Sequence, residues 1–472
     1  MIATGGPPPP IHVVTRGSVA VLDDADVRSP AQAALRGLAR SAPYERPGLA
    51  CFQIDLDPDA GATDLDLLVA ELRGAGGETD VAHRRGERFA ARLVRGLPER
   101  AAREPVPAAG RSFRLDLATP GLLDRLELVE VERRAPGPGE VEVEVRAAGL
   151  NFLDVLGAMG LRPDLAGRAL ALGGECSGIV ARVGPGVAGL APGDEVIAIG
   201  SPAFASHLTT RAVHVAPKPR RLSFEEAAAI PLVYLTAVYA LRHVGRLEAG
   251  ERVLVHSASG GTGLAAIQVA RALGAEVLAT AGRPEKREYL HSIGIRHVFD
   301  SRSGAFAGEV LEATGGRGVD VVLNSLTGEA IAKNLAALAP YGRFLELGKR
   351  EIYQGGRLDL GPFRKNLSYS AIDVGQLLVD RPEYAARLLA GIVAEFDRGD
   401  LAPPPVETFP VSRSADAFRR MAGARHVGKI VVSLADPEAR IGPAARPRAG
   451  IRSDRTYLVT GGTGGLGQTL AR

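Results

Sequence analysis

Three closely spaced glycines, Gly260, Gly261 and Gly263, form the stretch of sequence whose chemistry is easiest to interpret. They lie between an apolar run, RVLVHSA, and a helix-like run, GLAAIQVARALG, with Thr262 inside the turn. Glycine lets the backbone turn tightly and lets a pyrophosphate approach the N-terminus of the following helix, where free N–H groups and the helix dipole favour negative charge. Many glycine clusters are plain turns, but the strand before, the helix after and a second strand at EVLAT indicate a dinucleotide-binding loop.

The segment after that second strand, ATAGRPEKR, indicates which dinucleotide is bound. NAD-binding folds usually place an Asp or Glu here to hold the ribose hydroxyls, and this segment has no acid before Glu285. It carries three basic residues instead, Arg283, Lys286 and Arg287. Basic groups at this position would pair with a 2′-phosphate, so we predict NADPH as the cofactor. The alternative is that all three are solvated loop charges.

The composition of the 472-residue chain argues against several classes of function. The net charge is +3 and the basic residues are spread along the chain, so nucleic acid is not an expected partner. The only two cysteines, Cys51 and Cys176, exclude a disulfide framework and a Cys-rich metal site and fit a reducing compartment, the cytoplasm. Apolar stretches end well short of about 18 residues and the first fifteen residues lack a signal-peptide pattern, so no membrane association is expected.

The periodicity of the sequence predicts the elements that must position these residues. Residues 1–105 predict a small α/β segment, with strands at IHVVTRG and LACFQIDL and helices at SPAQAALRGL and DLDLLVAELRGAG. Ser29 is the expected cap of the first helix, and a hairpin is expected to turn at Arg85 and Gly86. The segment PERAAREPVPAAG, residues 98–110, has linker composition.

The rest of the chain predicts two kinds of domain. Residues 112–215 contain short alternating runs separated by Gly, Pro or Asp, as expected of a β-rich domain. From about Phe224, helical stretches alternate with buried strands, which is the pattern of a parallel doubly wound sheet. A helix-like run, PEYAARLLAGIVAEFDRGDL, and a strand, GKIVVSL, follow, and residues 436–453 form a second predicted linker. The expected fold class is α/β.

Several motifs in order carry a resemblance to a known family. They include AAGLNFLDVLGAMG, GGECSGIVARVGPGV, IPLVYLTAVYAL, HSASGGTGLAAIQVA, GVDVVLNSLTGEAI, GRFLELGKREIY and AFRRMAGARHVGKIVV. With them, residues 111–435 resemble the enoylreductase domain of polyketide synthases, a zinc-free branch of the medium-chain dehydrogenase/reductase superfamily. The resemblance implies a GroES-like substrate subdomain, residues 111–233 and 363–435, and an NADPH-binding Rossmann subdomain, residues 234–362.

The flanking segments resemble parts of a ketoreductase. TGGTGGLG fits the TGxxxGxG opening of short-chain reductases through Thr460, Gly461, Gly465 and Gly467, so residues 454–472 resemble the start of a ketoreductase catalytic domain. Residues 1–105 resemble its structural, non-catalytic part. The chain therefore resembles an excerpt of a larger synthase, and nineteen residues are too few for a Rossmann domain, so no ketoreductase activity is expected.

The resemblance also implies a metal-free reaction. Zinc-dependent relatives have a histidine before the glutamate of GGECSG, where this chain has Gly174. Cys176 is expected to be a small buried hydrophobe rather than a ligand. The implied reaction reduces a 2-enoyl thioester carried on an acyl carrier protein: hydride attacks Cβ, charge develops on the thioester oxygen, and Cα is then protonated. Donors aimed at that oxygen would lower the barrier most, and a backbone N–H would suffice.

The resemblance assigns site residues one by one. Asn151, in GLNFLD, matches the family position near nicotinamide and substrate and is the candidate catalytic residue beside Lys286; the alternative is an ordinary turn asparagine. Thr236 and Asn366 match positions near the nicotinamide end, and either could instead be a cap. The remaining implied cofactor-binding residues are Asn324, which ends the strand-like run VDVVLN, and Leu347 and Gly348, which follow the run GRFLE.

Lys286 has two implied roles that conflict. It is the family's candidate proton donor, and it lies where a 2′-phosphate partner would lie. A proton donor should titrate near the operating pH, whereas binding to a phosphate raises the pKa of a lysine. The acidic partner that the family often has is Ala305 here, so cofactor binding is favoured and water or another group would supply the proton. Arg162 stands where some members have a tyrosine, which excludes that tyrosine as the donor if the alignment holds.

Partners and competing functions complete the expectations. The expected partners are an acyl carrier protein and the neighbouring ketoreductase and dehydratase domains; the basic run PKPRR, residues 217–221, could meet an acidic carrier or be an ordinary surface loop. His207, His214 and His256 could act as acids by chemistry alone and rank below the family positions. The competing functions are a free-standing NADPH quinone reductase and an inactive cofactor-binding scaffold.

Overall fold

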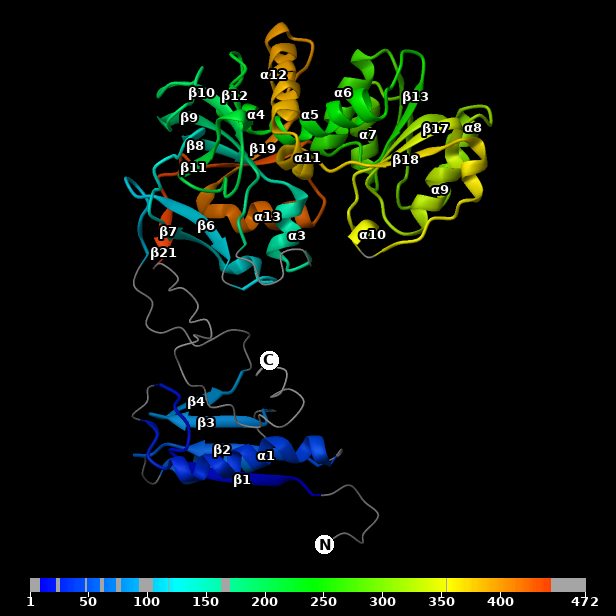
Figure 1. The fold of residues 1–472 in the computed structure, drawn as a ribbon. Helices are drawn as coiled ribbons and strands as arrows, with labels where there is room; N and C mark the ends of the chain where they lie inside the picture. The colour runs from blue at the N-terminus through cyan, green and yellow to red at the C-terminus, as the bar shows by residue number, and fades with distance from the viewer. Residues whose placement is uncertain are drawn as a thin grey trace. The chain divides into compact units, whose positions relative to one another are not determined.

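The computed structural model describes residues 9–22, 26–46, 49–59, 63–73, 78–92, 105–117, 119–162, 170–353 and 355–442. The chain divides into two compact units, Met1–Glu99 (unit 1) and Arg100–Arg472 (unit 2) (Figure 1). The ketoreductase-like residues from Thr460 to Gly467 lie outside the described residues, as do residues 98–104 of the predicted linker. Among the described residues, no helix has both the length and the apolar content that a membrane span requires.

Unit 1 contains a four-stranded sheet and two helices. Its elements are β1 (Ile11–Arg16), the short 3-10 helix η2 (Pro30–Gln32), α1 (Ala33–Glu45), β2 (Cys51–Leu56), α2 (Thr63–Leu72), β3 (Asp80–Arg84) and β4 (Glu87–Ala90). The sheet order is β1-β2-β3-β4; the first three strands are parallel and β4 is antiparallel to β3. The hairpin turns at Arg85 and Gly86, both with positive φ, as predicted. Ser29 is the N-cap residue of η2, which leads into α1, with Pro30 next to it as predicted, but its side chain makes no capping hydrogen bond.

A buried ion pair lies at the centre of unit 1. The Arg84 side chain is 2% exposed; it donates to the Asp55 carboxylate at 2.5 Å and to backbone carbonyls that include that of Val19. Ser18 and Thr15 donate to the same carboxylate, each at 2.6 Å. Burial raises the pKa of Asp55, but the hydrogen bonds from Ser18, Thr15 and Arg84 outweigh it and hold the pKa below 3.8. The carboxylate therefore stays charged, and it needs Arg84 as its counter-ion.

Replacing Arg84 by methionine is expected to destabilise unit 1 by about 3–5 kcal/mol, because it leaves a buried carboxylate without its counter-ion. The measurement is urea-induced unfolding followed by hydrogen exchange in the β2 and β3 peptides. Arg92→Met is the control, because Arg92 pairs with Glu78 on the exposed surface and its loss should leave the unfolding midpoint unchanged. Equal effects of the two substitutions would contradict the expectation.

The β-rich part of unit 2 is built from segments that lie far apart in sequence. Its elements are β5 (Val106–Pro107), β6 (Phe113–Leu117), β7 (Leu126–Glu130), β8 (Glu140–Gly149), α3 (Phe152–Ala158), β9 (Glu175–Val183), β10 (Glu195–Ile199), β11 (His207–Arg211), β12 (Val215–Pro217), α4 (Phe224–Ala228), β19 (Val406–Pro410), α13 (Ser414–Ala422), β20 (Lys429–Ser433) and β21 (Arg440–Gly442). The main sheet has the order β12-β10-β9-β8-β20-β19, with β11 paired to β8, and a smaller sheet has the order β5-β21-β7-β6. Strand β20 pairs with β8, so a late segment of the chain completes the sheet that carries Asn151 at its edge.

Two segments predicted as linkers contain strands. Strand β5 lies within the segment 98–110 and β21 lies within 436–453, and the two pair with each other. Pro, Gly and small residues gave both segments linker composition. Ile441 is nevertheless only 1% exposed and packs with Ala108 and Ala439 in the β-rich core, which explains why the chain is ordered there.

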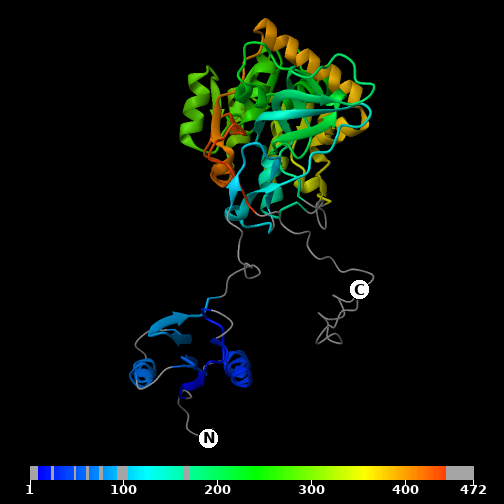
Figure 2. The same ribbon diagram turned by 90° about the vertical axis from the view of Figure 1, so that its left-hand side faces the viewer.

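The second part of unit 2 is a six-stranded parallel sheet covered by helices (Figures 1 and 2). Its elements are α5 (Pro231–Val238), the π-helical turn η6 (Tyr239–Val244), β13 (Arg252–Val255), α6 (Gly261–Ala272), β14 (Glu276–Thr280), α7 (Pro284–Ser292), β15 (His297–Phe299), α8 (Phe306–Ala313), β16 (Val319–Asn324), α9 (Glu329–Ala337), β17 (Leu338–Glu346), α10 (Arg350–Tyr353), the 3-10 helix η7 (Gly361–Lys365), β18 (Ser368–Ala371), α11 (Val374–Asp380) and α12 (Pro382–Arg398). The order β15-β14-β13-β16-β17-β18 is the 3-2-1-4-5-6 order of dinucleotide-binding sheets. The sheet extends past residue 362, the predicted subdomain boundary, because β18 is its sixth strand.

Alternate residues of the central strands enter two cores. Val253 and Val255 of β13 pack with α5, α6 and α12 on one face of the sheet. Leu254, between them, packs with Phe306 of α8 and Leu335 of α9 on the other face. This alternation is why the strands are apolar throughout, as expected where helices cover both faces of a parallel sheet. The carboxyl ends of the strands are left free to carry polar groups.

Candidate active site

The glycine loop connects β13 to α6, as predicted. Gly260 is the N-cap of α6, and Gly261 begins the helix with Thr262 and Gly263 in its first turn. A Cβ on Gly263 would lie 2.6 Å from the Ala258 Cα, so only glycine fits there. The first-turn N–H groups of a helix that follows such a turn can hold a pyrophosphate, which is the role predicted for these four residues.

A second loop is bonded to the glycine loop. Gly428 donates its N–H to the Ser259 carbonyl at 2.8 Å, and it pairs with Gly260 as an isolated parallel bridge. Gly428 has φ +75, and a Cβ on it would lie 2.1 Å from the Pro405 carbonyl oxygen. The segment leading into β20 is therefore held against the loop that the sequence assigns to the cofactor.

Several cationic side chains lie close together at the C-terminal end of β14. Lys286 lies in the first turn of α7, and its pKa is lowered by burial and by the positive charges of Arg283, Arg420 and Arg302. Arg302 lies against the chain here, since a Cβ on Gly282 would lie 2.9 Å from the Arg302 Nε. A phosphate dianion would relieve this repulsion, which is the arrangement expected of a 2′-phosphate site.

Three basic residues near Lys286 were not predicted from sequence. Arg302 follows β15, Arg420 lies on α13 and His426 precedes β20, so all three come from segments well beyond the basic run around Lys286. Arg420 also pairs with Glu407 at 2.9 Å. Burial, followed by the charges of Lys286, Lys429 and Arg420, lowers the pKa of His426 to about 4, so this imidazole is neutral at physiological pH.

Arg287 is directed away from that group. It pairs with Asp300 at 3.2 Å and donates to the Ala281 carbonyl at 3.2 Å. These contacts hold the end of β14 beside β15. The cofactor-binding role predicted for Arg287 has no contact in its support and stays a prediction.

Asn151 is held by a buried ion pair. It precedes α3 at the end of β8, and its Oδ1 accepts a hydrogen bond from Lys429 Nζ at 2.6 Å, while its Nδ2 donates to Glu175 Oε1 at 2.9 Å. Lys429 and Glu175 are themselves 2.6 Å apart and 3% and 0% exposed. The other Glu175 oxygen accepts the N–H of Leu232 at 2.7 Å. The Asn151 amide therefore has one orientation, fixed by a cation on its oxygen and a carboxylate on its nitrogen.

Lys429 also reaches the glycine loop. A Cβ on Gly261 would lie 3.2 Å from the Lys429 Cδ, so the lysine stem passes over the start of α6 before its ammonium reaches Asn151. Lys429 was not among the site residues predicted from the sequence, where it is only part of the strand-like run GKIVVSL. The structure thus brings the cofactor loop and the candidate catalytic residue together through one side chain.

Asp154 supports the same corner of the site. Its two oxygens accept the backbone N–H groups of Asn151 and Gly173, each at 2.9 Å. Burial raises the pKa of Asp154 to about 6, although the two N–H groups and the charge of Lys429 act against that rise. Asp154 therefore fixes the backbone at Asn151 and the turn before Glu175.

Apolar packing surrounds Gly174, the residue at which the resemblance expects a histidine in zinc-dependent relatives. A Cβ on Gly174 would lie 3.2 Å from the Leu232 Cδ1, and burial raises the pKa of the Cys176 thiol well above its usual value. No group of three or more His, Cys, Asp or Glu side chains suited to a metal occurs in the described ranges. The residues present do not fit a zinc ion, and the metal-free reaction stays a prediction.

The other predicted nicotinamide-end residues fall into separate places. The Thr236 hydroxyl donates to the Leu232 carbonyl at 2.7 Å, one turn earlier in α5, so it lies on the far side of Leu232 from Glu175. Asn324 ends β16 and is fully buried; Leu347 donates its N–H to the Asn324 carbonyl at 2.9 Å. Asn366 ends η7 in a left-handed conformation, φ +57, and no described contact joins it to the other predicted residues.

The remaining candidates have structural contacts. Burial lowers the pKa of His207 and His214, and the ring of His214 contacts the Leu378 carbonyl. Lys218, in the basic run predicted as a carrier contact, is 8% exposed and donates to the Leu222 carbonyl at 2.6 Å. That lysine is therefore not available to a partner.

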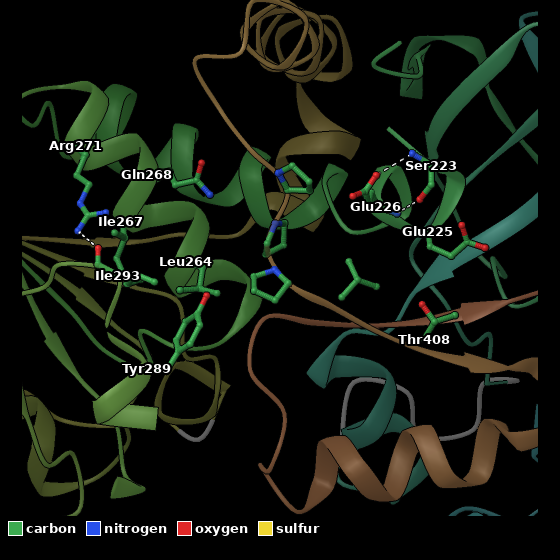
Figure 3. Close-up of a pocket in the computed structure, with 14 residues that line it drawn as sticks. Ser223, Glu225, Glu226, Leu264, Ile267, Gln268, Arg271, Tyr289, Ile293 and Thr408 are labelled. Carbon is green, nitrogen blue, oxygen red and sulfur yellow. Dashed lines mark hydrogen bonds between the residues drawn. The ribbon is translucent and has the colours of Figure 1, made fainter. Parts of the chain in front are cut away.

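A groove of about 970 Å³ is lined by residues of α4, α6 and α7 and by the segment that leads into β19 (Figure 3). Leu264, Ile267 and Tyr289 line one side, and Glu225 and Glu226 lie across from them. None of the predicted site residues lines this groove, so it is separate from the candidate active site.

Replacing Lys429 by methionine is expected to lower the free energy of unfolding of unit 2 by about 3–5 kcal/mol, because Glu175 is left as a buried uncompensated charge. Scanning calorimetry is the measurement. Adding Glu175→Gln should restore most of the loss, since a glutamine oxygen can still accept the Leu232 N–H. The control is Lys349→Met, whose partner Asp373 is partly exposed, with an expected cost of at most about 1 kcal/mol. Failure of the second substitution to restore stability would contradict the charge-pair account.

Comparisons with known proteins agree on one family. Three family profiles match: Polyketide synthase extender module SpnB, Rossmann fold domain, at residues 8–93; Alcohol dehydrogenase GroES-like domain, at 137–220; and Zinc-binding dehydrogenase, at 293–432. The mycocerosic acid synthase-like polyketide synthase of Mycolicibacterium smegmatis is 42% identical over 472 residues, 99% of this chain. The phthioceranic/hydroxyphthioceranic acid synthase of Mycobacterium tuberculosis is 41% identical over 470 residues, also 99% of this chain. The chain spans 22% of the length of each of these relatives.

Solved structures give the same result. The CurK enoyl reductase is 41% identical with a TM-score of 0.64, and the JamJ enoyl reductase in its apo form is 37% identical with a TM-score of 0.65. Matches cover 68% and 69% of this chain and 99% of each neighbour. A quinone oxidoreductase of Pseudomonas syringae is more distant, at 29% identity and a TM-score of 0.60. The predicted fold class, a GroES-like domain joined to a parallel Rossmann sheet after a smaller α/β segment, is confirmed.

Proposed function

Since the chain belongs to the polyketide synthase enoylreductase family, we propose that it reduces the C2–C3 double bond of an enoyl thioester with NADPH. The observation that carries the proposal is the position of Lys429, whose stem lies over Gly261 of the glycine loop and whose ammonium holds Asn151. A cofactor bound at the loop would therefore have its reactive end within reach of the candidate catalytic amide. The family position of Asn151 beside the nicotinamide agrees with this.

NADPH is proposed over NADH because of the cations at the end of β14. Lys286, Arg283 and Arg302 lie close enough together for Arg283 and Arg302 to lower the Lys286 pKa, and no acid stands on the β14 end to receive a ribose hydroxyl. Charge-assisted hydrogen bonds from such a group to a 2′-phosphate are stronger than neutral ones. When bound, NADPH would supply the hydride from C4 of its nicotinamide.

Asn151 is proposed to stabilise charge on the thioester oxygen. One Nδ2 hydrogen donates to Glu175 at 2.9 Å, whereas the other reaches the Gly149 carbonyl only at 3.4 Å, a weak hydrogen bond. That second hydrogen is the one a thioester oxygen can take over as its charge develops. Lys429, by binding the amide oxygen, keeps the nitrogen turned toward the substrate side.

The partners of this reaction are also proposals. The enoyl chain would arrive on the phosphopantetheine arm of an acyl carrier protein, and ketoreductase and dehydratase domains of the same synthase would supply the enoyl thioester. Residues 1–105 are proposed as the structural part of such a ketoreductase, next to the enoylreductase in residues 111–435. The free thiols of Cys51 and Cys176 fit a reducing location, for which we propose the cytoplasm.

The experiment that tests the function follows NADPH consumption by absorbance with crotonyl-pantetheine, beside NADH and a simple quinone. Turnover of the thioester with a preference for NADPH is the expected result. Turnover only with the quinone would replace the proposal by a quinone reductase. NADPH binding without turnover of either substrate would replace it by a cofactor-binding scaffold.

Two substitutions separate phosphate binding from proton donation. Lys286→Ala and Arg302→Ala are each expected to raise the KM for NADPH by roughly 10- to 150-fold. This range corresponds to the loss of one hydrogen bond to a charged group, which is worth about 1.5–3 kcal/mol. The kcat with NADPH and all kinetic parameters with NADH should stay unchanged. Steady-state kinetics with both cofactors measure this. Arg398→Ala, which removes an exposed pair with Asp400, is the control. A fall in kcat with both cofactors in Lys286→Ala alone would make Lys286 the proton donor instead.

A further inference from the structure

Buried side chains form one continuous chain of hydrogen bonds beneath the predicted cofactor site. It begins at Thr280, whose hydroxyl lies 2.8 Å from His256 Nδ1, and passes from His256 Nε2 to Asn334 Oδ1 at 2.6 Å. Asn334 Nδ2 then donates to Asn324 Oδ1 at 3.1 Å, and Asn324 Nδ2 donates to Glu346 Oε2 at 2.7 Å. All five side chains are at most 3% exposed.

The chain ends at a residue of the predicted nicotinamide site. Glu346 Oε1 accepts the backbone N–H of Gly348 at 2.6 Å. A Cβ on Gly348 would lie 2.8 Å from the same carboxylate oxygen, so the turn after β17 is closed directly over Glu346. Lys349, the next residue, pairs with Asp373 at 2.6 Å.

The direction of every hydrogen bond in the chain is determined by its ends. The Glu346 carboxylate can only accept, so Asn324 must present its nitrogen to it and its oxygen to Asn334. Asn334 in turn presents its oxygen to His256, which must carry its proton on Nε2 and accept from Thr280 on Nδ1. Burial lowers the pKa of His256 to about 4, which agrees with this neutral form. The Asn324 amide is held in the same orientation by the Leu326 backbone, whose carbonyl accepts from Nδ2 at 2.8 Å and whose N–H donates to Oδ1 at 3.1 Å. The Glu346 carboxylate and this turn therefore orient the other side chains together.

The chain crosses the sheet where its strand order reverses. Thr280 ends β14, His256 follows β13, Asn324 ends β16 and Glu346 ends β17, while Asn334 lies on α9. In this strand order the reversal lies between β13 and β16, which is where doubly wound sheets bind their ligands. The members of the chain thus stand at four successive strand ends, below the edge at which the cofactor is proposed to bind.

We propose that Glu346, acting through this chain and through Gly348, is a positioning residue for the nicotinamide end of the cofactor. The inference rests on the proposed function, which supplies the cofactor. Glu346 fixes the Leu347–Gly348 turn by its bond to the Gly348 N–H, and the four polar side chains fix Glu346. The adenosine end is held separately, by the glycine loop and the cations beside Lys286. We therefore expect disruption of the chain to weaken the binding of the nicotinamide and to leave the binding of the 2′-phosphate unchanged.

The test exchanges an amide and a carboxylate across the Asn324–Glu346 contact. Asn324→Asp places two carboxyl groups 2.7 Å apart in a buried site. At a pH below the raised pKa of this pair, the two groups share one proton. At a pH above that pKa, both are charged and repel each other. NADPH affinity of this variant is expected to fall as pH rises, by up to about tenfold per pH unit above that pKa, which is the limit for loss of one proton. Wild type lacks this step.

Two further variants complete a double-mutant cycle. In Glu346→Gln, the new amide has only one oxygen for the two donors that Glu346 accepts, Asn324 Nδ2 and the Gly348 N–H. One donor therefore faces the amide nitrogen, and NADPH binding is expected to weaken at every pH. In the double variant Asn324→Asp/Glu346→Gln, the new amide can donate to Asp and accept from Gly348, so binding is expected to return toward wild type and to lose its pH step. Gln376→Glu is the matched control. It also replaces an amide that donates to a carboxylate by a second carboxyl group, but next to Asp380 on the exposed face of α11.

The readouts are dissociation constants for NADPH, by fluorescence, and for 2′,5′-ADP, by calorimetry, between pH 5.5 and 8.5. The proposal requires that the variants weaken NADPH and leave 2′,5′-ADP unchanged, and that the double variant rescue. Equal weakening of both ligands, or no pH step in Asn324→Asp, overturns the positioning role while the proposed function stands. If wild type binds neither ligand, both proposals fall.

A more conservative variant guards against a substitution that prevents folding. Thr280→Val keeps the shape of the side chain and removes the hydroxyl that donates to His256 Nδ1, at the end of the chain farthest from Gly348. If the chain positions the turn as one unit, this variant also weakens NADPH more than 2′,5′-ADP. A change in 2′,5′-ADP binding alone would contradict transmission along the chain.

Discussion

The buried ion pair between Glu175 and Lys429 is the constraint on which the candidate site depends. Moving two charges out of water costs several kcal/mol for each, and the pair is stable only if further hydrogen bonds satisfy both groups. Here the Asn151 oxygen accepts from the lysine, and the Leu232 N–H donates to the glutamate. The charges can be buried only when the end of β8, the start of β9, the start of α5 and the start of β20 come together. The contacts that offset the desolvation cost of the two charges are therefore the same contacts that bring these four segments of the site together.

This arrangement shows how the candidate catalytic amide is held in one orientation by protein groups alone. A metal would orient its ligands by coordination, whereas here a cation and an anion bind opposite ends of one side chain. The Asn151 amide cannot flip, because flipping would place its nitrogen against Lys429 and its oxygen against Glu175. The second buried network, from Thr280 to Glu346, uses the same device at the strand ends of the separate six-stranded parallel sheet, where a carboxylate binds a neutral amide. In both places the acceptor-only character of a carboxylate fixes a group that would otherwise have two orientations.

Local sequence patterns were sufficient to predict much of the fold and part of the candidate site. The glycine loop, the alternating strands and helices around it and the hairpin at Arg85 and Gly86 depend on neighbouring residues, and these predictions are confirmed. Lys429, Arg302 and His426 could not be found in this way, because each reaches the site from a segment far along the chain. The strands β5 and β21 were missed for a related reason. Their order depends on a pairing between residues more than 300 positions apart, and composition alone does not encode it.

The surroundings of Lys286 favour one of its two candidate roles on electrostatic grounds. Every charge that shifts its pKa is positive, and the position where the family often has an acid is Ala305, the N-cap of α8. In the free protein the pKa of Lys286 is shifted downward, which is the direction that a proton donor needs. A phosphate dianion among these cations would reverse the shift, because it stabilises the ammonium more than burial destabilises it. With NADPH bound, Lys286 would hold its proton more tightly than an acid that must release it to Cα. The cations that lower the pKa of the free lysine are thus the same groups that, in the proposed binding mode, would hold the phosphate that raises it again.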